Sequence, residues 1–309
     1  MSDREVTMSQ FTRHSVKVPA NGVELDAWLY LPACEEASLN KPAPAIVMSH
    51  GFAAVKELYI DKFAEAFAKA GFAVLLYDHR NFGKSGGEPR GEIIPYQQIE
   101  DMREVISWLS FHPEVNAEQI GVWGTSFSGG HAIMVGALDR RVKCIVAQVP
   151  TISGYQTFLR RAGSRLRAVQ EEFEQDRTRR SKGETPTYIG VIPQEEQPGI
   201  YASDEAMAFY SKAWTLAEGW ENRVTLRSSE KASEYEPGLW IARVSPTPLL
   251  MIVAEDDTVT PTDLALSAFN RALEPKRLCL LPGGHFDPYV THSTRSITEA
   301  IAWLSKYLK

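Results

Sequence analysis

Residues 120–130 read IGVWGTSFSGG, a short apolar run that leads into a turn of small residues around Ser126. The next residues, HAIMVGA, have helical character. A strand that turns sharply into a helix at a serine is the context of a nucleophile elbow, in which the turn strains the serine backbone and projects its hydroxyl. Gly124 is the small residue needed before the serine, and Ser128, still small, stands where a glycine is usual. The stretch predicts a nucleophilic serine; the alternative is a glycine-rich turn with an incidental serine.

Five other short, wholly apolar runs are typical of parallel strands covered on both faces. They are residues 45–48, 72–77, 144–149, 249–253 and 278–281. Between them, apolar residues recur at helical spacing, as at Phe63 and Phe67, at Ile99, Met102, Ile106 and Leu109, and at Ile297, Ile301, Leu304 and Leu308. Residues 23–31 instead alternate in polarity, which indicates a strand with one buried face, and Asn21-Gly22 before them is a hairpin signal.

This order of elements predicts an α/β fold. Its central sheet is expected to be mostly parallel, with antiparallel N-terminal strands and helices on both faces. In such sheets ligands and catalytic groups gather at the carboxyl ends of the strands. The residues that directly follow each apolar run are therefore the candidates for function.

One stretch interrupts the alternation of strands and helices, because residues 151–244 contain no run of the buried-strand kind. Leu159, Leu166 and Phe173 recur there at heptad-like spacing, residues 206–220 suit further helices, and residues 183–199 have the composition of a loop. We therefore expect residues 1–150 to form the first part of a core. Residues 151–244 would then form an inserted, mostly helical cap over the strand ends, and residues 245–309 the second part of the core.

The composition is that of a globular protein, since 44% of the 309 residues are hydrophobic and 23% are charged. A net charge of -6 counts against a nucleic-acid partner. Cys34, Cys144 and Cys279 lie far apart, which suggests neither a disulfide framework nor a cysteine zinc site. The first residues, MSDREVTMSQ, lack the apolar stretch of a secretory signal, and no window approaches the roughly eighteen apolar residues of a membrane span. We expect a cytoplasmic protein.

A serine hydroxyl needs a general base and a group that orients the base. Residues 254–261, AEDDTVTP, form an acidic turn after one apolar run, and residues 282–287, PGGHFD, follow the last run and contain His285. The order Ser126, acid, His285 is the order of the nucleophile-elbow fold. The alternative for His285 is an ordinary surface-loop histidine.

These motifs together resemble the α/β-hydrolase superfamily. Its acid typically stands four residues before a proline, which selects Asp257, before Pro261, over its neighbour Asp256. Residues 50–52, HGF, are similar to the oxyanion loop of that superfamily. The resemblance implies an oxyanion hole made by the backbone N–H groups of Phe52 and Phe127.

The likeness extends to one branch of the superfamily. Residues 50–88, the GTSFSGG elbow and the position of the cap resemble the dienelactone hydrolase and X-prolyl peptidase (S15-like) branch, including polyketide transferase-type proteins. Ser126 departs from the cysteine of dienelactone hydrolases and from the aspartate of epoxide and haloalkane hydrolases. Residues 78–85, DHRNFGKS, match a loop that is mainly architectural in the superfamily.

Several other residues allow two interpretations each. His50 is interpreted as holding its turn and not as a catalytic residue, and His131 as a packed and not a catalytic side chain. The arginines of residues 160–180 could form an anion site, but the acidic residues among them favour ion pairs on a solvated helix. The aromatic residues of the cap could line an acyl pocket or only pack the cap; they are Tyr155, Phe158, Tyr188, Trp214 and Trp220.

The sequence thus predicts a serine hydrolase for a carboxylic ester or thioester, with Ser126 as nucleophile, His285 as base and Asp257 as the orienting acid. The acyl-enzyme would need no metal or organic cofactor, and the expected partner is a small acyl substrate. The first alternative is an acyltransferase with the same acyl-enzyme. Weaker alternatives are a peptidase, a carbon–carbon bond hydrolase and a non-catalytic ligand-binding protein. The sequence leaves the oligomeric state open, a homodimer included.

Overall fold

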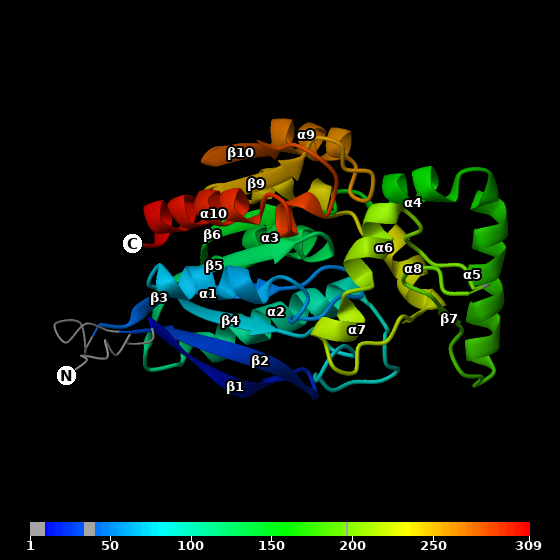
Figure 1. Cartoon of the computed structure of the whole chain (residues 1–309), viewed down its shortest axis with the longest axis horizontal. Coiled ribbons are helices and arrows are strands. Elements are labelled where there is room, and N and C mark those ends of the chain that lie inside the picture. The colour runs from blue at the N-terminus through cyan, green and yellow to red at the C-terminus, as the bar shows by residue number, and fades with distance from the viewer. Residues whose placement is uncertain (1–9, 34–40, 196) are drawn as a thin grey trace, which may run out of the picture.

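An eight-stranded sheet in the order β1-β2-β4-β3-β5-β6-β9-β10 runs through the computed structural model (Figure 1). β1 and β2 are antiparallel to their neighbours, and the strands from β4 to β10 are parallel to one another. This is the sheet that the sequence predicts. The strands are β1 (Phe11–Ala20), β2 (Val23–Pro32), β3 (Ala43–Ser49), β4 (Ala73–Tyr77), β5 (Val115–Thr125), β6 (Val142–Gln148), β9 (Leu249–Ala254) and β10 (Lys276–Leu281).

The structure describes residues 10–33, 41–195 and 197–309. The expected non-secretory N-terminus, residues 1–9, and Cys34 lie outside these ranges. Within them, Cys144 and Cys279 are free thiols in buried positions. No helix of the described part of the chain has the length and apolar character needed to cross a bilayer.

The hairpin signal at Asn21-Gly22 is confirmed, since β1 and β2 pair with Ala20 opposite Val23. Both turn residues have positive φ, 46° and 84°, as a type I′ turn requires. The expectation of one buried face for β2 is wrong, because Asp26 and Tyr30 on its other face are also buried. Lys56 covers Asp26 with an ion pair of 2.8 Å, which explains how a polar residue is accommodated there.

Helices cover both faces of the sheet. α1 (Asp61–Lys69) and α10 (Ser293–Leu308) pack together on one face, α2 (Pro95–Ser110) and α3 (Phe127–Leu138) on the other, and α9 (Thr262–Arg271) lies beside β9. Their predicted apolar stripes are the sides that contact the core: Phe63 and Phe67 of α1 and Met102 and Leu109 of α2 are fully buried.

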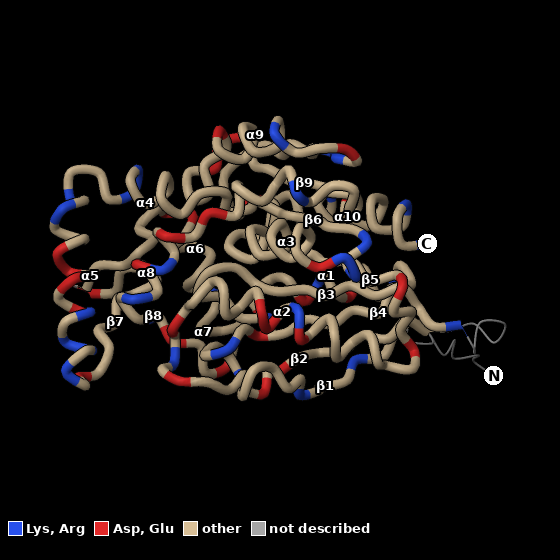
Figure 2. Tube along the Cα trace, turned by 180° about the vertical axis from the view of Figure 1, so that it is seen from behind, with Lys and Arg blue, Asp and Glu red and all other residues tan. Residues whose placement is uncertain are grey.

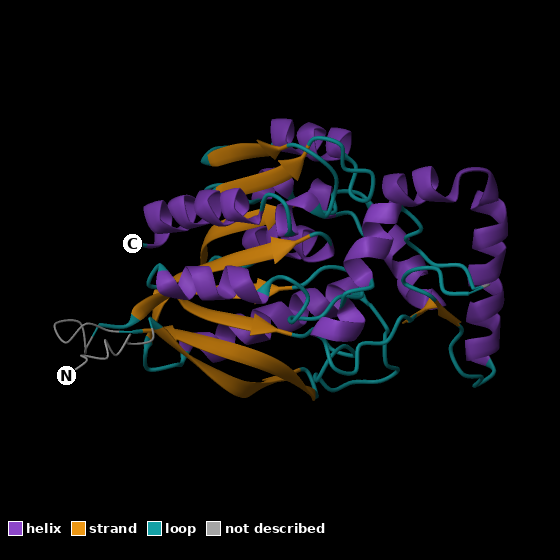
Figure 3. Cartoon of the chain, viewed as in Figure 1, coloured by secondary structure: helices purple, strands orange, loops and turns teal. Residues whose placement is uncertain are grey.

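The segment between β6 and β9 lies beyond the carboxyl ends of the strands (Figure 3). It is mostly helical, as expected, with α4 (Gly154–Ala162), α5 (Leu166–Ser181), α6 (Asp204–Tyr210), α7 (Ala213–Leu216) and α8 (Leu226–Ser233). Two strands of two residues each, β7 (Tyr188–Ile189) and β8 (Val224–Thr225), pair within it and are too short to give a sequence signal. The heptad-like spacing does not mark one helix, because Gly163, with φ 50°, separates α4 from α5.

The inner part of this segment is joined to the core. Phe209, Tyr210 and Trp220 belong to the main hydrophobic cluster, together with residues of the sheet and its helices. The outer part has its own small cluster around Phe158 and Phe173. The segment therefore rests on the strand ends through α6 and α7, while α5 lies farthest from the sheet (Figure 1).

Candidate active site

Ser126 occupies the sharp turn between β5 and α3. Its backbone has φ 55° and ψ -117°, a combination that costs energy for a residue with a side chain and that is the strained turn predicted from the sequence. A Cβ at Gly124 would overlap the backbone carbonyl of Ser128, so the turn requires glycine there. Ser126 is 6% exposed, and its hydroxyl points to the end of the sheet where the inserted segment lies.

Ser128, in the place where a glycine is usual, has a structural role. Its hydroxyl lies 2.5 Å from the carbonyl oxygen of His50 and 2.7 Å from Nε2 of His79. Because the hydroxyl has one hydrogen, which it donates to the carbonyl, Nε2–H of His79 is the donor in the second contact. Ser128 therefore joins the elbow to the loops that follow β3 and β4, and it is fully buried.

His285 connects Ser126 to the acidic turn. It lies in the loop after β10, with Nε2 at 3.0 Å from the Ser126 hydroxyl and Nδ1 at 2.7 Å from a carboxylate oxygen of Asp257. His285 is 2% exposed. The interpretation of His285 as an ordinary surface-loop histidine is therefore wrong, and the three residues brought together from three strand ends are those predicted from the sequence.

Asp257 is fixed by its own turn after β9. Its Oδ1 accepts the backbone N–H groups of Val259 and Thr260, both at 2.8 Å, which leaves Oδ2 to face His285. The neighbouring Asp256 is exposed and forms no hydrogen bond with His285. The choice of Asp257 over Asp256 agrees with this geometry.

Two hydroxyl groups at this site were not predicted from the sequence. Thr260 Oγ1 lies 2.8 Å from Asp257 Oδ2 and 3.2 Å from Nδ1 of His285, so it adds a polar neighbour to their hydrogen bond. The hydroxyl of Tyr289 lies 2.5 Å from Thr125 Oγ1, beside Ser126, and burial raises the pKa of this phenol. Tyr289 comes four residues after His285, and that proximity is the signal that could have identified it.

The loop after β3 approaches Ser126 closely. A Cβ at Gly51 would lie 2.9 Å from Cβ of Ser126, so only glycine allows this contact without a shift. In the described part of the chain, neither the N–H of Phe52 nor that of Phe127 donates to a protein acceptor. His50 donates from Nδ1 to the Gly51 carbonyl at 2.9 Å, as expected for a histidine that holds its turn.

Three buried histidines lie behind the elbow. Burial lowers the pKa of His50 to about 4 and that of His131 to about 3, and it also lowers the pKa of His79 well below the ordinary value. His131 is packed, as predicted, with Nδ1 at 2.8 Å from the Tyr235 hydroxyl and Nε2 at 3.0 Å from Gln98. All three rings are therefore neutral at pH 7.

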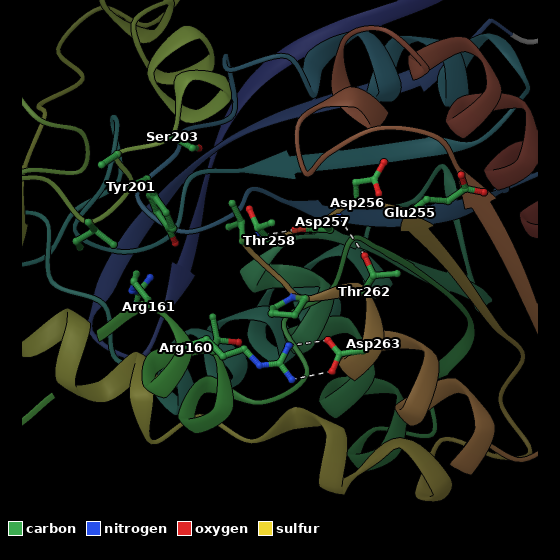
Figure 4. A pocket seen from close by; sticks show the side chains of 15 residues that line it. Arg160, Arg161, Tyr201, Ser203, Glu255, Asp256, Asp257, Thr258, Thr262 and Asp263 are labelled. Carbon is green, nitrogen blue, oxygen red and sulfur yellow. Dashed lines mark hydrogen bonds and ion pairs between the residues drawn. The ribbon is translucent and has the colours of Figure 1, made fainter. Parts of the chain in front are cut away.

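Ser126 lines two small cavities, with volumes of about 30 Å³ and about 10 Å³. The larger of the two shares Arg161 and Tyr201 with an open cavity of about 750 Å³, which also contacts the turn of Asp257 (Figure 4). In Figure 4, Arg161 and Tyr201 lie on one side of this open cavity and the acidic turn on the other. The open cavity thus adjoins the small cavity beside the serine.

None of the five cap aromatics named as possible pocket residues, Trp220 included, lines either cavity at Ser126. Tyr155 and Trp214 are about half exposed, Phe158 packs on Phe173, and Tyr188 lies under the guanidinium of Arg223. The aromatic residues that do line these cavities are Phe52, Phe127, Tyr201, Phe209, Tyr210, Phe286 and Tyr289. Phe52, Phe127, Phe286 and Tyr289 belong to core loops of the site, whereas Tyr201, Phe209 and Tyr210 belong to the inserted segment, whose path decides which of its rings face the serine.

Most arginines of residues 160–180 form ion pairs, as the sequence favours, whereas Arg161 lies over the Tyr201 ring and Arg179 bonds to Thr187. On α5, Arg167 pairs with Glu171 at 2.9 Å and Arg180 with Asp176 at 2.7 Å, and Figure 2 shows both charge signs along this helix. Arg160 instead reaches Asp263 of α9. Among the described residues, no group of three or more His, Cys, Asp or Glu side chains is arranged to hold a metal ion.

Comparison with known proteins agrees with the fold. The family model for X-Pro dipeptidyl-peptidase (S15 family) matches residues 21–287. The chain is 32% identical to the polyketide transferase grgF of a Penicillium species, over 91% of this chain and 92% of that protein. It is 33% identical to a thiohydrolase of Eupenicillium brefeldianum, over 86% and 85% of the two chains. The crystal structure of the α/β-hydrolase GrgF superposes with a TM-score of 0.82 at 29% identity, covering 96% of this chain and 99% of that one.

Proposed function

The chain belongs to the X-Pro dipeptidyl-peptidase (S15) family and has the α/β-hydrolase fold, and from this premise we propose that it cleaves a carboxylic ester or thioester through an acyl-enzyme on Ser126. The observation that carries the proposal is the buried chain of hydrogen bonds from Ser126 through His285 to Asp257. A serine with a base at 3.0 Å, whose other nitrogen is held by a carboxylate, has the parts that nucleophilic catalysis needs.

The proposed reaction begins when Oγ of Ser126 attacks the substrate carbonyl carbon and Nε2 of His285 takes the hydroxyl proton. The N–H groups of Phe52 and Phe127 stabilise the oxyanion of the tetrahedral intermediate. Collapse breaks the bond to the alcohol or thiol, which leaves with the proton from His285. A water molecule, deprotonated by His285, then attacks the carbonyl of the acyl-enzyme in the same way. Collapse of this second intermediate releases the carboxylic acid and returns the proton to Ser126. Asp257 keeps the imidazole oriented and stabilises its positive charge.

The proposed substrate class draws on the relatives. Proteins about one-third identical to this chain are named thiohydrolase and polyketide transferase, names that fit thioester and acyl chemistry. The proposal places the reactive carbonyl of a small acyl compound at Ser126 and the rest of the compound toward the open cavity of about 750 Å³. It assigns residues 151–244 to a cap that limits access to the serine.

Transfer of the acyl group to an alcohol is a second candidate. Ser126 is 6% exposed, and the cavity beside it holds about 30 Å³, so little space is open to water around the acyl carbonyl. The relative named a polyketide transferase supports the same alternative. In this reaction His285 would deprotonate an acceptor alcohol instead of water.

The test is a time course of product release from p-nitrophenyl esters and acyl thioesters of increasing chain length, with and without alcohols. We expect continued turnover of at least one series and its loss by a factor on the order of a million in Ser126→Ala. A burst of one equivalent, followed by turnover only when an alcohol is added, would identify the transferase. Full activity of Ser126→Ala would contradict both candidates.

A further inference from the structure

Three consecutive carbonyl groups of the loop that carries Phe52 accept hydrogen bonds from side chains. The Gly51 carbonyl accepts Nδ1–H of His50 at 2.9 Å. The next carbonyl, of Phe52, accepts the hydroxyl of Tyr210 at 2.7 Å, and the next, of Ala53, accepts Nε1–H of Trp220 at 2.8 Å. The first donor belongs to the core, whereas the other two belong to the inserted segment.

The backbone between these two donors is strained. Ala53 has φ 55°, in the left-handed region that residues with a side chain rarely adopt. Such a conformation persists only where its surroundings fix it. Tyr210 binds the carbonyl before the α-carbon of Ala53 and Trp220 binds the carbonyl after it, so the two donors hold the strained residue from both sides.

The two donors are themselves rigidly placed. Tyr210 is 5% and Trp220 7% exposed, and their rings stack at 6.1 Å. Tyr210 also stacks on Tyr201 at 5.9 Å. Burial raises the pKa of the Tyr210 phenol well above its ordinary value, so the hydroxyl keeps the hydrogen that it donates.

Helix α6, which ends at Tyr210, also contacts the loop of His285. The ring of Phe209 lies 4.4 Å from that of Phe286, the residue after the histidine. The carboxylate of Glu205 lies so close to Gly284 that a Cβ there would overlap it. Helix α6 therefore spans the loop of Phe52 and the loop of His285.

We propose that Tyr210 and Trp220 are positioning residues that hold the N–H of Phe52 toward the oxyanion, so that the inserted segment takes part in stabilising the transition state as well as in admitting substrate. The inference rests on the proposed function, because it requires an oxyanion at Ser126. A trans peptide points its N–H and C=O in opposite directions. The N–H of Phe52 therefore points away from the Gly51 carbonyl that His50 holds. Tyr210 and Trp220 hold the next two peptide groups, which limits rotation of the backbone that follows this N–H.

The test is Tyr210→Phe, which removes one hydrogen bond and keeps the ring. We expect kcat to fall by about tenfold to a hundredfold, less than the loss on deleting an oxyanion donor itself, with KM changed by less than about threefold. Affinity for a trifluoromethyl ketone analogue of the best substrate, which forms a tetrahedral adduct with the serine, should fall in parallel with kcat. Trp220→Phe should show the same pattern.

The controls are Tyr307→Phe and Trp240→Phe, the same chemical changes at half-buried positions far from the loop. Both should keep the parent kcat. Unchanged kcat in Tyr210→Phe and Trp220→Phe, or a loss confined to KM, would overturn the inference. If Ser126→Ala is inactive in the same assay, the proposed function survives that outcome; if Ser126→Ala is active, the proposed function itself fails.

Discussion

At the residue scale, Asp256 and Asp257 are adjacent in the chain, yet only Asp257 faces His285. Its Oδ2 lies 2.7 Å from Nδ1 of the imidazole. In Asp257→Asn the amide cannot stabilise the imidazolium, and it favours the wrong tautomer of the ring. We expect kcat to fall by about ten-thousandfold, the size of effect known for this substitution in a Ser-His-Asp triad, measured by steady-state kinetics with the best ester.

Asp256→Asn is the matched control, since it makes the same change on an exposed neighbour. It should retain kcat within about tenfold, because it contacts neither His285 nor Ser126. Equal losses in the two variants would mean that the charge of the turn matters and the contact with His285 does not.

Ser128 should matter for stability. Ser128→Ala leaves the His50 carbonyl and Nε2–H of His79 without their buried partner. We expect the free energy of unfolding to fall by about 1–3 kcal/mol, the cost of an unsatisfied buried polar group, measured by urea denaturation.

Ser110→Ala, at the end of α2, tests whether any serine hydroxyl would have this effect. Its hydroxyl bonds only to a carbonyl of its own helix in a half-buried position, so the change should be within about 0.5 kcal/mol. A Ser128→Ala protein as stable as the parent would show that the bonds to His50 and His79 contribute nothing.

At the scale of elements, the β3 loop and the elbow must meet without a side chain between them. Gly51→Ala would place a methyl group 2.9 Å from Cβ of Ser126 and 3.4 Å from its hydroxyl. The loop would have to move by a few tenths of an ångström or more, carrying the N–H of Phe52 away from the oxyanion. We expect kcat to fall by up to about a hundredfold with little change in melting temperature.

Gly86→Ala is the corresponding control, because the nearest atom to its new methyl group would be 3.4 Å away. It should keep the parent kcat. A Gly51→Ala enzyme with the kcat of the parent would mean that the contact between the loop and the serine is dispensable.

Local signals predicted the core elements well. Wholly apolar runs predicted every parallel strand, and the small residues around Ser126 predicted the elbow, because each pattern is complete within a few consecutive residues. The buried outer face of β2 was missed, since Asp26 is buried only through Lys56, which comes thirty residues later. The break at Gly163 was missed because glycine there adopts a positive φ that the apolar spacing does not report.

The residues of the site also fall into a group that the sequence predicts and a group that it does not. Ser126, Asp257 and His285 each follow a strand, so the topology of the sheet brings them together once the strands are known. Tyr210 and Trp220 could not be found in this way, because their partners in the β3 loop lie 158 and 167 residues earlier in the chain. Contacts of the inserted segment with the core depend on its tertiary path, which has no local signature.

At the scale of the whole molecule, the buried histidines make stability depend on pH. The unfolded chain protonates its histidines below about pH 6.5, whereas folded His50 and His131 take up protons only near pH 4 and pH 3. Between these limits the unfolded state binds more protons, so the free energy of unfolding falls as the pH falls. Each histidine contributes up to about 1.4 kcal/mol per pH unit.

Urea titrations at pH 7.0, 6.0, 5.0 and 4.5 would measure this dependence. His131→Gln removes one of these groups. The slope of its free energy of unfolding against pH should therefore be smaller, by the amount that corresponds to the uptake of about one proton. A parent protein whose stability is flat from pH 6.5 to pH 4.5, or a variant with an unchanged slope, would contradict the neutral state of these rings.

The central claim is that Ser126 is a nucleophile activated by His285. The most direct measurement is intact-protein and peptide mass spectrometry after reaction with a fluorophosphonate, which labels activated serines. The account predicts one phosphonyl group per chain, located on Ser126, and its loss in His285→Ala. A label on another residue, or equal labelling of Ser126 in His285→Ala, would contradict the account.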